Sequence, residues 1–102
     1  KAWLGGRLRL KGALVIDHGA AAALLGGSSL LAKGVMAVEG DFRRGDALAI
    51  RDGAGRVLAH GLSEYDAAEC TAILGLHSSE QEKLLGYAPR SAMVHRDQLV
   101  LL

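Results

Sequence analysis

The sequence predicts an α+β fold, mostly β with helices, in which a small barrel of short strands carries helices on its rim. Three observations support this prediction. Short apolar runs alternate with polar residues at the period of two that half-buried strands show. An Asp-Gly turn signal at 52–53 separates two such runs, as in a β-hairpin. An alanine- and leucine-rich run between Asp17 and Gly26 is flanked by residues suited to capping a helix.

The first half of the chain is expected to form strands, one helix and a further strand. Residues 7–11 alternate between basic and apolar side chains and predict a short half-buried strand, and 13–16 predict a buried one. Asp17 can accept backbone N–H groups at the start of the following helix, and Gly26 ends that helix. After a glycine-containing loop, alternation over 35–40 predicts the next strand.

The second half is expected to begin with a hairpin and to end in strands. Residues 47–50 and 57–62 are apolar or alternating, and they flank a turn at 52–55. The last strand or strands are expected over 92–95 and 99–102. With the helices between them, the order of the chain is strand–helix–strands–helix–strand.

Two helices are expected between the hairpin and the last strands. Ser63 is the predicted N-cap of the first helix, with Asp66 three residues later as in a capping box, and Gly75 ends it. Ser79 opens the second helix in the same way, and Gly86 ends it.

Size and composition fit one domain with an aliphatic core. The chain has 102 residues, of which 50% are apolar but only 4% aromatic. No apolar run approaches the roughly 20 residues that cross a bilayer, so no membrane partner is expected. The single cysteine, Cys70, cannot form an internal disulfide, which fits a reducing compartment and a cytoplasmic protein. Its expected role is that of a small buried helix residue.

Charges are unevenly distributed although the formal net charge is only +1. The bases among residues 1–11 have no acid between them, and Arg43 and Arg44 are adjacent. In contrast, acids occur repeatedly from Glu64 to Glu82 before the next base. A basic edge and an acidic helical edge can contact a partner domain as well as RNA.

The loop 26–35 is the first candidate for a binding site, because its glycines permit close approach of a partner. A phosphate-binding P-loop is excluded. That motif needs glycine immediately before its lysine and Ser or Thr immediately after it, whereas Ala32 and Gly34 flank Lys33.

Side chains in this loop are expected to divide between the core and a partner. Leu30 and Leu31 are predicted to anchor the loop to the core. Ser28, Ser29 and Lys33 are predicted to face the partner.

No catalytic residue and no metal site are predicted. The histidines at 18, 60, 77 and 95, together with Cys70, lack the short spacings that clamp a metal ion. No Gly-x-Ser-x-Gly elbow surrounds a serine. His95-Arg96-Asp97 has two interpretations, a strand-exit turn with an Arg–Asp contact or a phosphate contact from Arg96.

Several segments together resemble a PUA domain, and they occur in the order 13–20, 27–35, 41–46, 57–63 and 94–97. More narrowly, the chain is similar to the C-terminal PUA region of the bacterial glutamate 5-kinase family. The distinguishing pieces are Trp3-Leu4-Gly5-Gly6, the Ser-Ser-Leu-Leu-x-Lys-Gly loop, the Ala-His-Gly strand, Leu85-Gly86-Tyr87 and the closing His-Arg-Asp. The resemblance implies a PUA-like pseudo-barrel over 13–102, with 1–12 as an entry segment or linker from a missing upstream domain.

The resemblance also implies a function. The parent enzyme would transfer the γ-phosphoryl group of ATP to the γ-carboxylate of glutamate with magnesium, the first step of proline biosynthesis. The kinase domain would lie upstream, and no catalytic residue can be assigned to this chain. The implied partners are that kinase domain or a neighbouring subunit.

RNA is a second implied partner, because PUA domains of RNA-modifying enzymes bind RNA through the first helix, the glycine loop after it and the last strand. At the matching positions, the candidate nucleic-acid-binding residues are Gly27, Ser28, Ser29, Lys33, Gly34 and Arg96. Three hypotheses therefore stay open: a regulatory or interaction domain of a glutamate kinase, an RNA-binding PUA module of an RNA-modifying enzyme, and an independent small enzyme.

Overall fold

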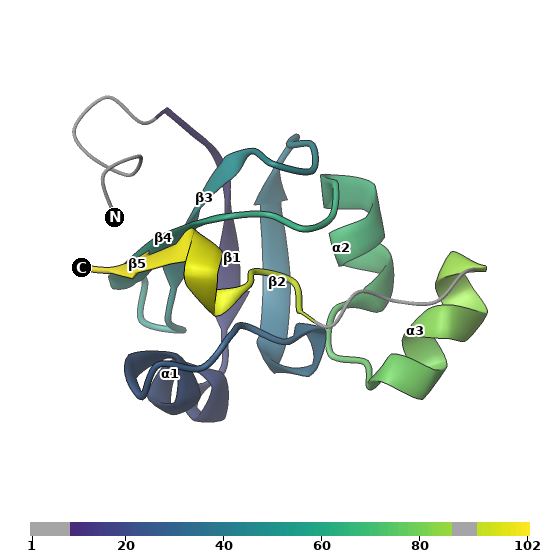
Figure 1. Cartoon of the computed structure of the whole chain (residues 1–102), viewed down its shortest axis with the longest axis horizontal. Helices are drawn as coiled ribbons and strands as arrows, with labels where there is room; N and C mark the ends of the chain where they lie inside the picture. The colour runs from purple at the N-terminus through teal and green to yellow at the C-terminus, as the bar shows by residue number, and fades with distance from the viewer. Residues whose placement is uncertain (1–8, 87–91) are drawn as a thin grey trace.

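A mixed five-stranded sheet forms the centre of the computed structural model, which describes residues 9–86 and 92–102 (Figure 1). The strand order is β2-β1-β3-β4-β5. β1 and β3 are parallel, and the other neighbouring strands are antiparallel. The strands are β1 (Leu10–Ile16), β2 (Val35–Gly40), β3 (Ala47–Arg51), β4 (Val57–Leu62) and β5 (Leu99–Leu101).

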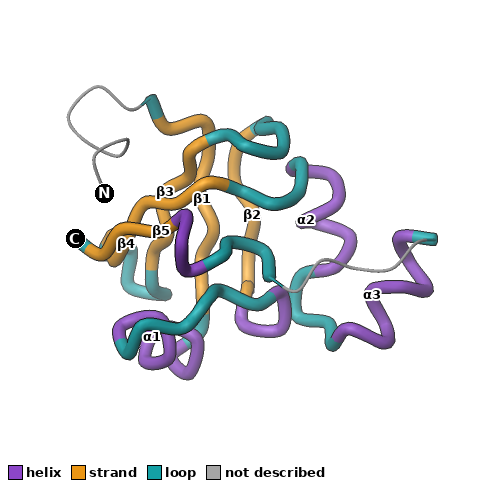
Figure 2. The backbone as a smooth tube through the Cα atoms, in the orientation of Figure 1, coloured by secondary structure: helices purple, strands orange, loops and turns teal. Residues whose placement is uncertain are grey.

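The helices lie around this sheet. α1 lies at one end of the sheet, α2 packs beside β2, and α3 lies outside α2 (Figure 2). The expected α+β class is thus confirmed. In the described part of the chain, the α-helices are α1 (His18–Leu25), α2 (Ala67–Ile73) and α3 (Ser78–Leu85), and the short 3₁₀ helices are η2 (Ala32–Gly34) and η3 (Arg96–Gln98).

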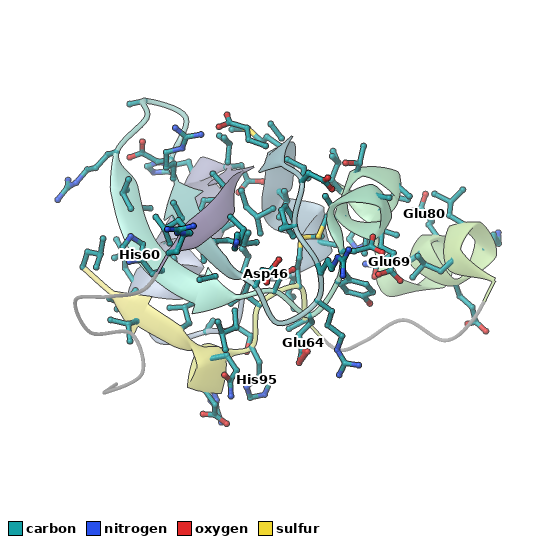
Figure 3. All side chains as sticks on the ribbon, turned by 90° about the horizontal axis from the view of Figure 1, so that it is seen from above. Asp46, His60, Glu64, Glu69, Glu80 and His95 are labelled. Atoms are coloured by element: carbon teal, nitrogen blue, oxygen red, sulfur yellow. The ribbon has the colours of Figure 1, made fainter. Side chains whose placement is uncertain are left out.

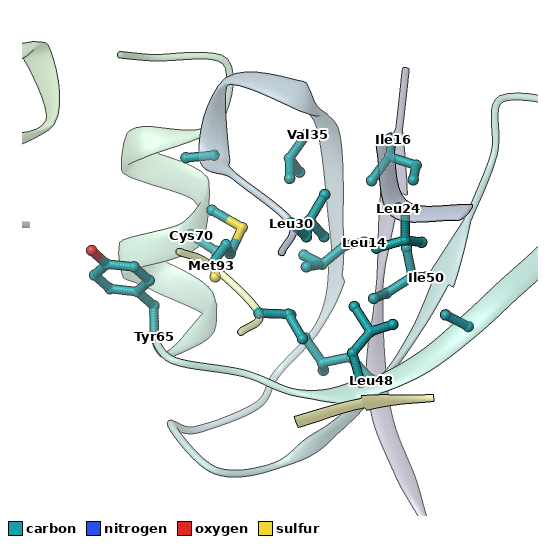
Figure 4. Packing of buried hydrophobic residues seen from close by; sticks show 14 of the residues in the cluster. Leu14, Ile16, Leu24, Leu30, Val35, Leu48, Ile50, Tyr65, Cys70 and Met93 are labelled. Carbon is teal, nitrogen blue, oxygen red and sulfur yellow. The ribbon is translucent and has the colours of Figure 1, made fainter. Parts of the chain in front are cut away.

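The core lies between the sheet and the segments that cover it. Along β3, alanines alternate with Leu48 and Ile50, so the two large side chains share one face and are fully buried. Leu14 of β1 packs in the same cluster, together with Leu24 of α1 and Leu30 of the loop (Figure 4). Most of this cluster is aliphatic, as the composition predicts, but its two largest buried side chains are the aromatic Phe42 and Tyr65.

The start of the sheet differs from the prediction. One continuous strand, β1, runs through the described parts of the two ranges, 7–11 and 13–16, where separate strands are expected, and residues 7–8 lie outside the described residues. Gly12 lets β2 approach closely, because a Cβ there would lie 2.3 Å from the carbonyl oxygen of Glu39. The proposed division after residue 12 stays a prediction, and it falls within β1. The family-like residues 3–6 and Tyr87 lie outside the described residues.

The N-cap of α2 differs from the predicted one. Asp66, not Ser63, is the N-cap, and its carboxylate accepts the Glu69 N–H at 2.7 Å while Glu69 accepts the Asp66 N–H at 3.0 Å. Ser63 cannot cap the helix because its backbone continues the strand pairing, donating to the Asp46 carbonyl and accepting from Gly45. Its hydroxyl donates to the Tyr65 carbonyl in a buried turn.

The third helix and the last strand are also corrected. α3 begins at Ser78 with His77 as its N-cap, so the expected cap Ser79 lies inside the helix. Residues 92–95 do not form a strand; a single bridge joins Leu30 to Val94, and the turn of η3 then separates this bridge from β5.

Candidate functional site

An open cleft of about 530 Å³ lies beside α1. One wall is the face of α1 that carries Gly19, Ala20 and Ala23, and the second is the loop from 28 to 34. The connection between α2 and α3 completes it with Gly75 and His77. Two successive segments of the chain, α1 and the loop after it, therefore form one concave surface with the distant α2–α3 connection.

The N-terminus of α1 is joined directly to the end of the loop. The Asp17 carboxylate caps the helix by accepting the Ala20 N–H at 2.7 Å, and the Asp17 N–H donates to the Gly34 carbonyl at 2.9 Å. Gly34 is required for this approach, since a Cβ at that position would lie 2.5 Å from the Cβ of Ala20. The predicted cap, Asp17, and the predicted loop glycine, Gly34, are thus joined by a hydrogen bond.

The C-terminus of α1 ends at a glycine, as predicted. Gly26 is the C-cap, and Gly27 adopts a positive φ of 97°. The Gly27 N–H donates to the Leu24 carbonyl and the Ser28 N–H to the Ala23 carbonyl, which is the Schellman arrangement. These bonds fix the direction in which the loop leaves the helix.

The loop is also joined to the C-terminal segment. The Leu30 N–H donates to the Val94 carbonyl at 2.9 Å, and the Met93 N–H donates to the Leu30 carbonyl at 2.8 Å. One residue earlier, the Ser29 hydroxyl accepts the Arg96 N–H at 2.8 Å. Backbone and side-chain bonds together hold the start of η3 against the loop.

The six predicted nucleic-acid-binding residues are placed as follows. Four of them line the cleft: Ser28, Ser29, Lys33 and Gly34. Arg96 is joined to Ser29 at the cleft wall and has an exposed side chain, whereas Gly27 shapes the loop without lining the cleft. Their assignment to nucleic-acid binding stays a prediction.

The prediction that Leu30 and Leu31 both anchor the loop to the core is correct for one of them. Leu30 is 1% exposed and belongs to the core, as predicted. Leu31 is 41% exposed and lines the cleft instead. The reason is that the extended backbone at Leu31 places its side chain opposite to that of Leu30.

Gly75 and His77 are cleft residues that sequence reasoning did not assign to a site. The Gly75 N–H donates to the Ala32 carbonyl at 2.7 Å and so holds the α2–α3 connection against η2. Gly75 was predicted only as the end of a helix, and nothing local in the sequence indicates a partner more than forty positions away.

Charges at the cleft are mixed. Lys33 and Asp17 both line it, and Asp17 already accepts the α1 cap bond. Next to the cleft wall, the Asp97 carboxylate lies 3.5 Å from the His95 ring, and the Asp97 N–H donates to His95 Nδ1 at 3.1 Å. The cleft therefore presents a small number of bases rather than a broad basic surface.

A second groove of about 540 Å³ lies on the other face of α1. Ala21, Ala22 and Leu25 line it from the helix, and Met36 lines it from β2. Leu25 is 56% exposed and Met36 is 50% exposed, so the groove presents large apolar side chains at its surface. Asp17, His18 and Asp52 also line it. Arg56 lines it from the base of the β3–β4 hairpin.

The titratable residues do not converge on a reactive centre in the part of the chain that the structure describes. No three His, Cys, Asp or Glu side chains there are close enough to hold a metal ion. Figure 3 shows His60 and His95 far from each other, and Glu69 and Glu80 on the side of α2 and α3.

The thiol of Cys70 is buried within α2 and the core. Burial raises the pKa of Cys70 to about 12, with smaller contributions from the hydrogen bond to Ser63, which lowers it, and from Asp66 and Glu69, which raise it. A protonated buried thiol is a poor nucleophile, and Cys70 acts here as a small core residue.

Within 9–86 and 92–102, none of the helices has the length and apolarity that a membrane span requires.

Comparison with known proteins gives relatives over the full length of the chain. It is 67% identical to the glutamate 5-kinase of Novosphingobium aromaticivorans over 102 residues, which is 100% of this chain and 27% of that protein. It is 62% identical to the glutamate 5-kinase of Sphingopyxis alaskensis, again over 100% of this chain and 28% of the relative. The chain thus spans about a quarter of the length of the curated relatives it matches.

Fold comparison and family comparison agree with each other. A crystal structure of a PUA domain from Aeropyrum pernix, solved as a tartrate complex, has a TM-score of 0.61 and 35% identity, covering 85% of this chain and 42% of that one. The PUA domain family matches residues 12–85. On the matched sequence, the mixed sheet and the glycine loop beside α1, the chain belongs to the PUA domain family.

Proposed function

We propose that this chain is the non-catalytic PUA domain of a glutamate 5-kinase. The observation that carries the proposal is the 67% and 62% identity to two glutamate 5-kinases over the whole chain. The complete protein would transfer the γ-phosphoryl group of ATP to the γ-carboxylate of glutamate, the first step of proline biosynthesis. ATP and magnesium belong, in this proposal, to the part of the enzyme beyond this chain.

The role of the domain in that enzyme would be regulation through contact with the kinase domain or a neighbouring subunit. The apolar groove supports this role, because exposed Leu25 and Met36 are suited to a protein surface rather than to a phosphate backbone. The relatives are nearly four times as long as this chain, so a large protein surface is available within the same molecule.

Deletion of the domain from the full-length protein tests the proposal. Glutamate phosphorylation should persist, and its inhibition by proline should change. Unchanged inhibition would contradict the regulatory role, and absence of kinase activity in the intact protein would contradict the assignment itself. The isolated chain should not turn over ATP and glutamate, and turnover would instead support an independent enzyme.

RNA binding in the cleft is the second candidate function, and it is also the function expected of a module from an RNA-modifying enzyme. The specific observation in its favour is the position of Lys33 in the cleft and of Arg96 next to its wall. Two such phosphate contacts predict a modest salt dependence, with a slope of log K against log salt near −1.5. Measurement of tRNA binding between low and physiological salt tests this, and no binding at low salt would exclude it.

A further inference from the structure

We infer that Ser29 is a positioning residue of the cleft, whose side chain fixes the start of η3, and Arg96 with it, against the glycine loop. The consequence for ligand binding rests on the proposed RNA interface. The contact itself is independent of that proposal.

The N–H groups of η3 identify what the Ser29 hydroxyl does. The first N–H groups of a helix have no acceptor within the helix. In η3 the Gln98 N–H donates to the His95 carbonyl at 2.8 Å, and the Asp97 N–H donates to His95 Nδ1. The Arg96 N–H donates to Ser29, which lies 67 positions earlier in the chain. Ser29 thus completes the cap of a helix to which it does not belong.

The Ser29 side chain makes a second contact between the loop and the C-terminal segment, beyond the backbone bridge. Within the residues that the structure describes, backbone pairing between the loop and the C-terminal segment is confined to the bridge at Leu30 and Val94. Beyond Val94 the chain turns into η3, and the bond from Arg96 to Ser29 is the contact that follows. This bond therefore fixes the backbone at the start of η3 relative to Ser29.

Ser29 is also one of the residues that line the cleft. A serine hydroxyl can accept two hydrogen bonds and donate one. Since Ser29 accepts the Arg96 N–H, its own proton is directed elsewhere, and hydrogen bonds in such a chain strengthen one another. The acceptor suited to this proton in the cleft is an anionic oxygen, such as that of a phosphate group.

Ser28 provides the matched control for the contact with η3. It has the same side chain and the adjacent position, and it is exposed. Its backbone N–H donates to the Ala23 carbonyl at the end of α1. The hydroxyl of Ser28 is not the acceptor of the Arg96 N–H.

The experiment compares Ser29→Ala, Ser29→Thr and Ser28→Ala in the ¹⁵N-labelled chain. Ser29→Ala should shift the Arg96 amide resonance and speed its hydrogen exchange about five-fold, as expected for the loss of one hydrogen bond. Ser29→Thr keeps the hydroxyl and should restore both values, and Ser28→Ala should leave both unchanged. An unchanged Arg96 amide in Ser29→Ala would overturn the inference.

Binding to unfractionated tRNA gives the second measurement. Ser29→Ala should bind about five-fold more weakly than the original chain and with a shallower salt dependence, because the Arg96 contact is misplaced. Ser29→Thr should recover the affinity. Wild-type affinity and slope in Ser29→Ala would overturn the positioning role. If the original chain does not bind tRNA, the RNA interface fails by itself, and the Arg96 amide decides the inference about Ser29.

Discussion

Replacement of Gly34 by alanine tests the contact that joins α1 to the end of the loop. The added Cβ would lie 2.5 Å from the Cβ of Ala20 and 3.6 Å from its Cα. The Ala20 methyl group cannot rotate away, because it is fixed to the helix backbone, so α1 or the loop must move. Overpacking of this kind typically costs about 1–3 kcal/mol. For a domain of this size we expect a fall in Tm on the order of 10 °C.

The measurement is urea or thermal unfolding of a double-mutant cycle. Ala20→Gly alone should destabilise the chain by about 0.5–1 kcal/mol, the usual cost of glycine in a helix. In the Gly34→Ala background the same substitution removes the clashing methyl group, so the double variant should be more stable than the sum of the two single effects predicts. Gly53→Ala is the control, because its Cβ would meet only the Met36 side chain at an ordinary 3.6 Å.

Two results would refute this reasoning. If Gly34→Ala unfolds at the same temperature as Gly53→Ala, the approach of the loop to α1 is not tight. If the effects of Ala20→Gly and Gly34→Ala simply add, the cost of Gly34→Ala arises elsewhere than at Ala20.

The remaining predictions concern the buried thiol and the two surfaces of α1. Because the pKa of Cys70 rises from 9.0 to about 12 on folding, the thiol ionises first in the unfolded chain, and the free energy of unfolding should fall above pH 9 by about 1.4 kcal/mol per pH unit. Urea unfolding of Cys70→Ala should lack this component, and equal slopes would contradict it. Lys33→Glu should weaken tRNA binding and leave the proline inhibition of the proposed full-length kinase unchanged. Met36→Glu should change that inhibition and leave tRNA binding unchanged. If each substitution changes both tRNA binding and proline inhibition, the cleft and the groove do not act as two separate surfaces.

The features that sequence reasoning located correctly depend on local chemistry. Asp17 caps α1 and Gly26 ends it through bonds to residues a few positions away. The turn at 52–55 is equally local, since the Asp52 carboxylate accepts the N–H groups of Ala54 and Arg56 at 3.0 Å. Such bonds are determined by residue type and spacing, and both are visible in one sequence.

The incorrect assignments arise where the tertiary structure selects among equivalent local patterns. Ser63 and Asp66 are both good N-caps, and the choice falls on Asp66 because strand pairing holds the backbone of Ser63. The third wall of the cleft depends on the bond between Gly75 and Ala32, which no local pattern encodes. The contact between Ser29 and Arg96 is likewise set by the tertiary structure, because the bridge between Leu30 and Val94 brings the two segments together.

The composition of α1 explains how one short helix can serve two different surfaces. Leu24 is its only buried residue, so its small side chains are available on both faces. The face with Ala20 and Ala23 borders the cleft beside Lys33, whereas the face with Leu25 borders the apolar groove. A base and hydroxyl groups suit an anionic ligand, and exposed apolar side chains suit a protein partner. A protein partner in the groove and an anionic ligand in the cleft would contact different faces of α1, so the two proposed functions do not compete for one face of the helix.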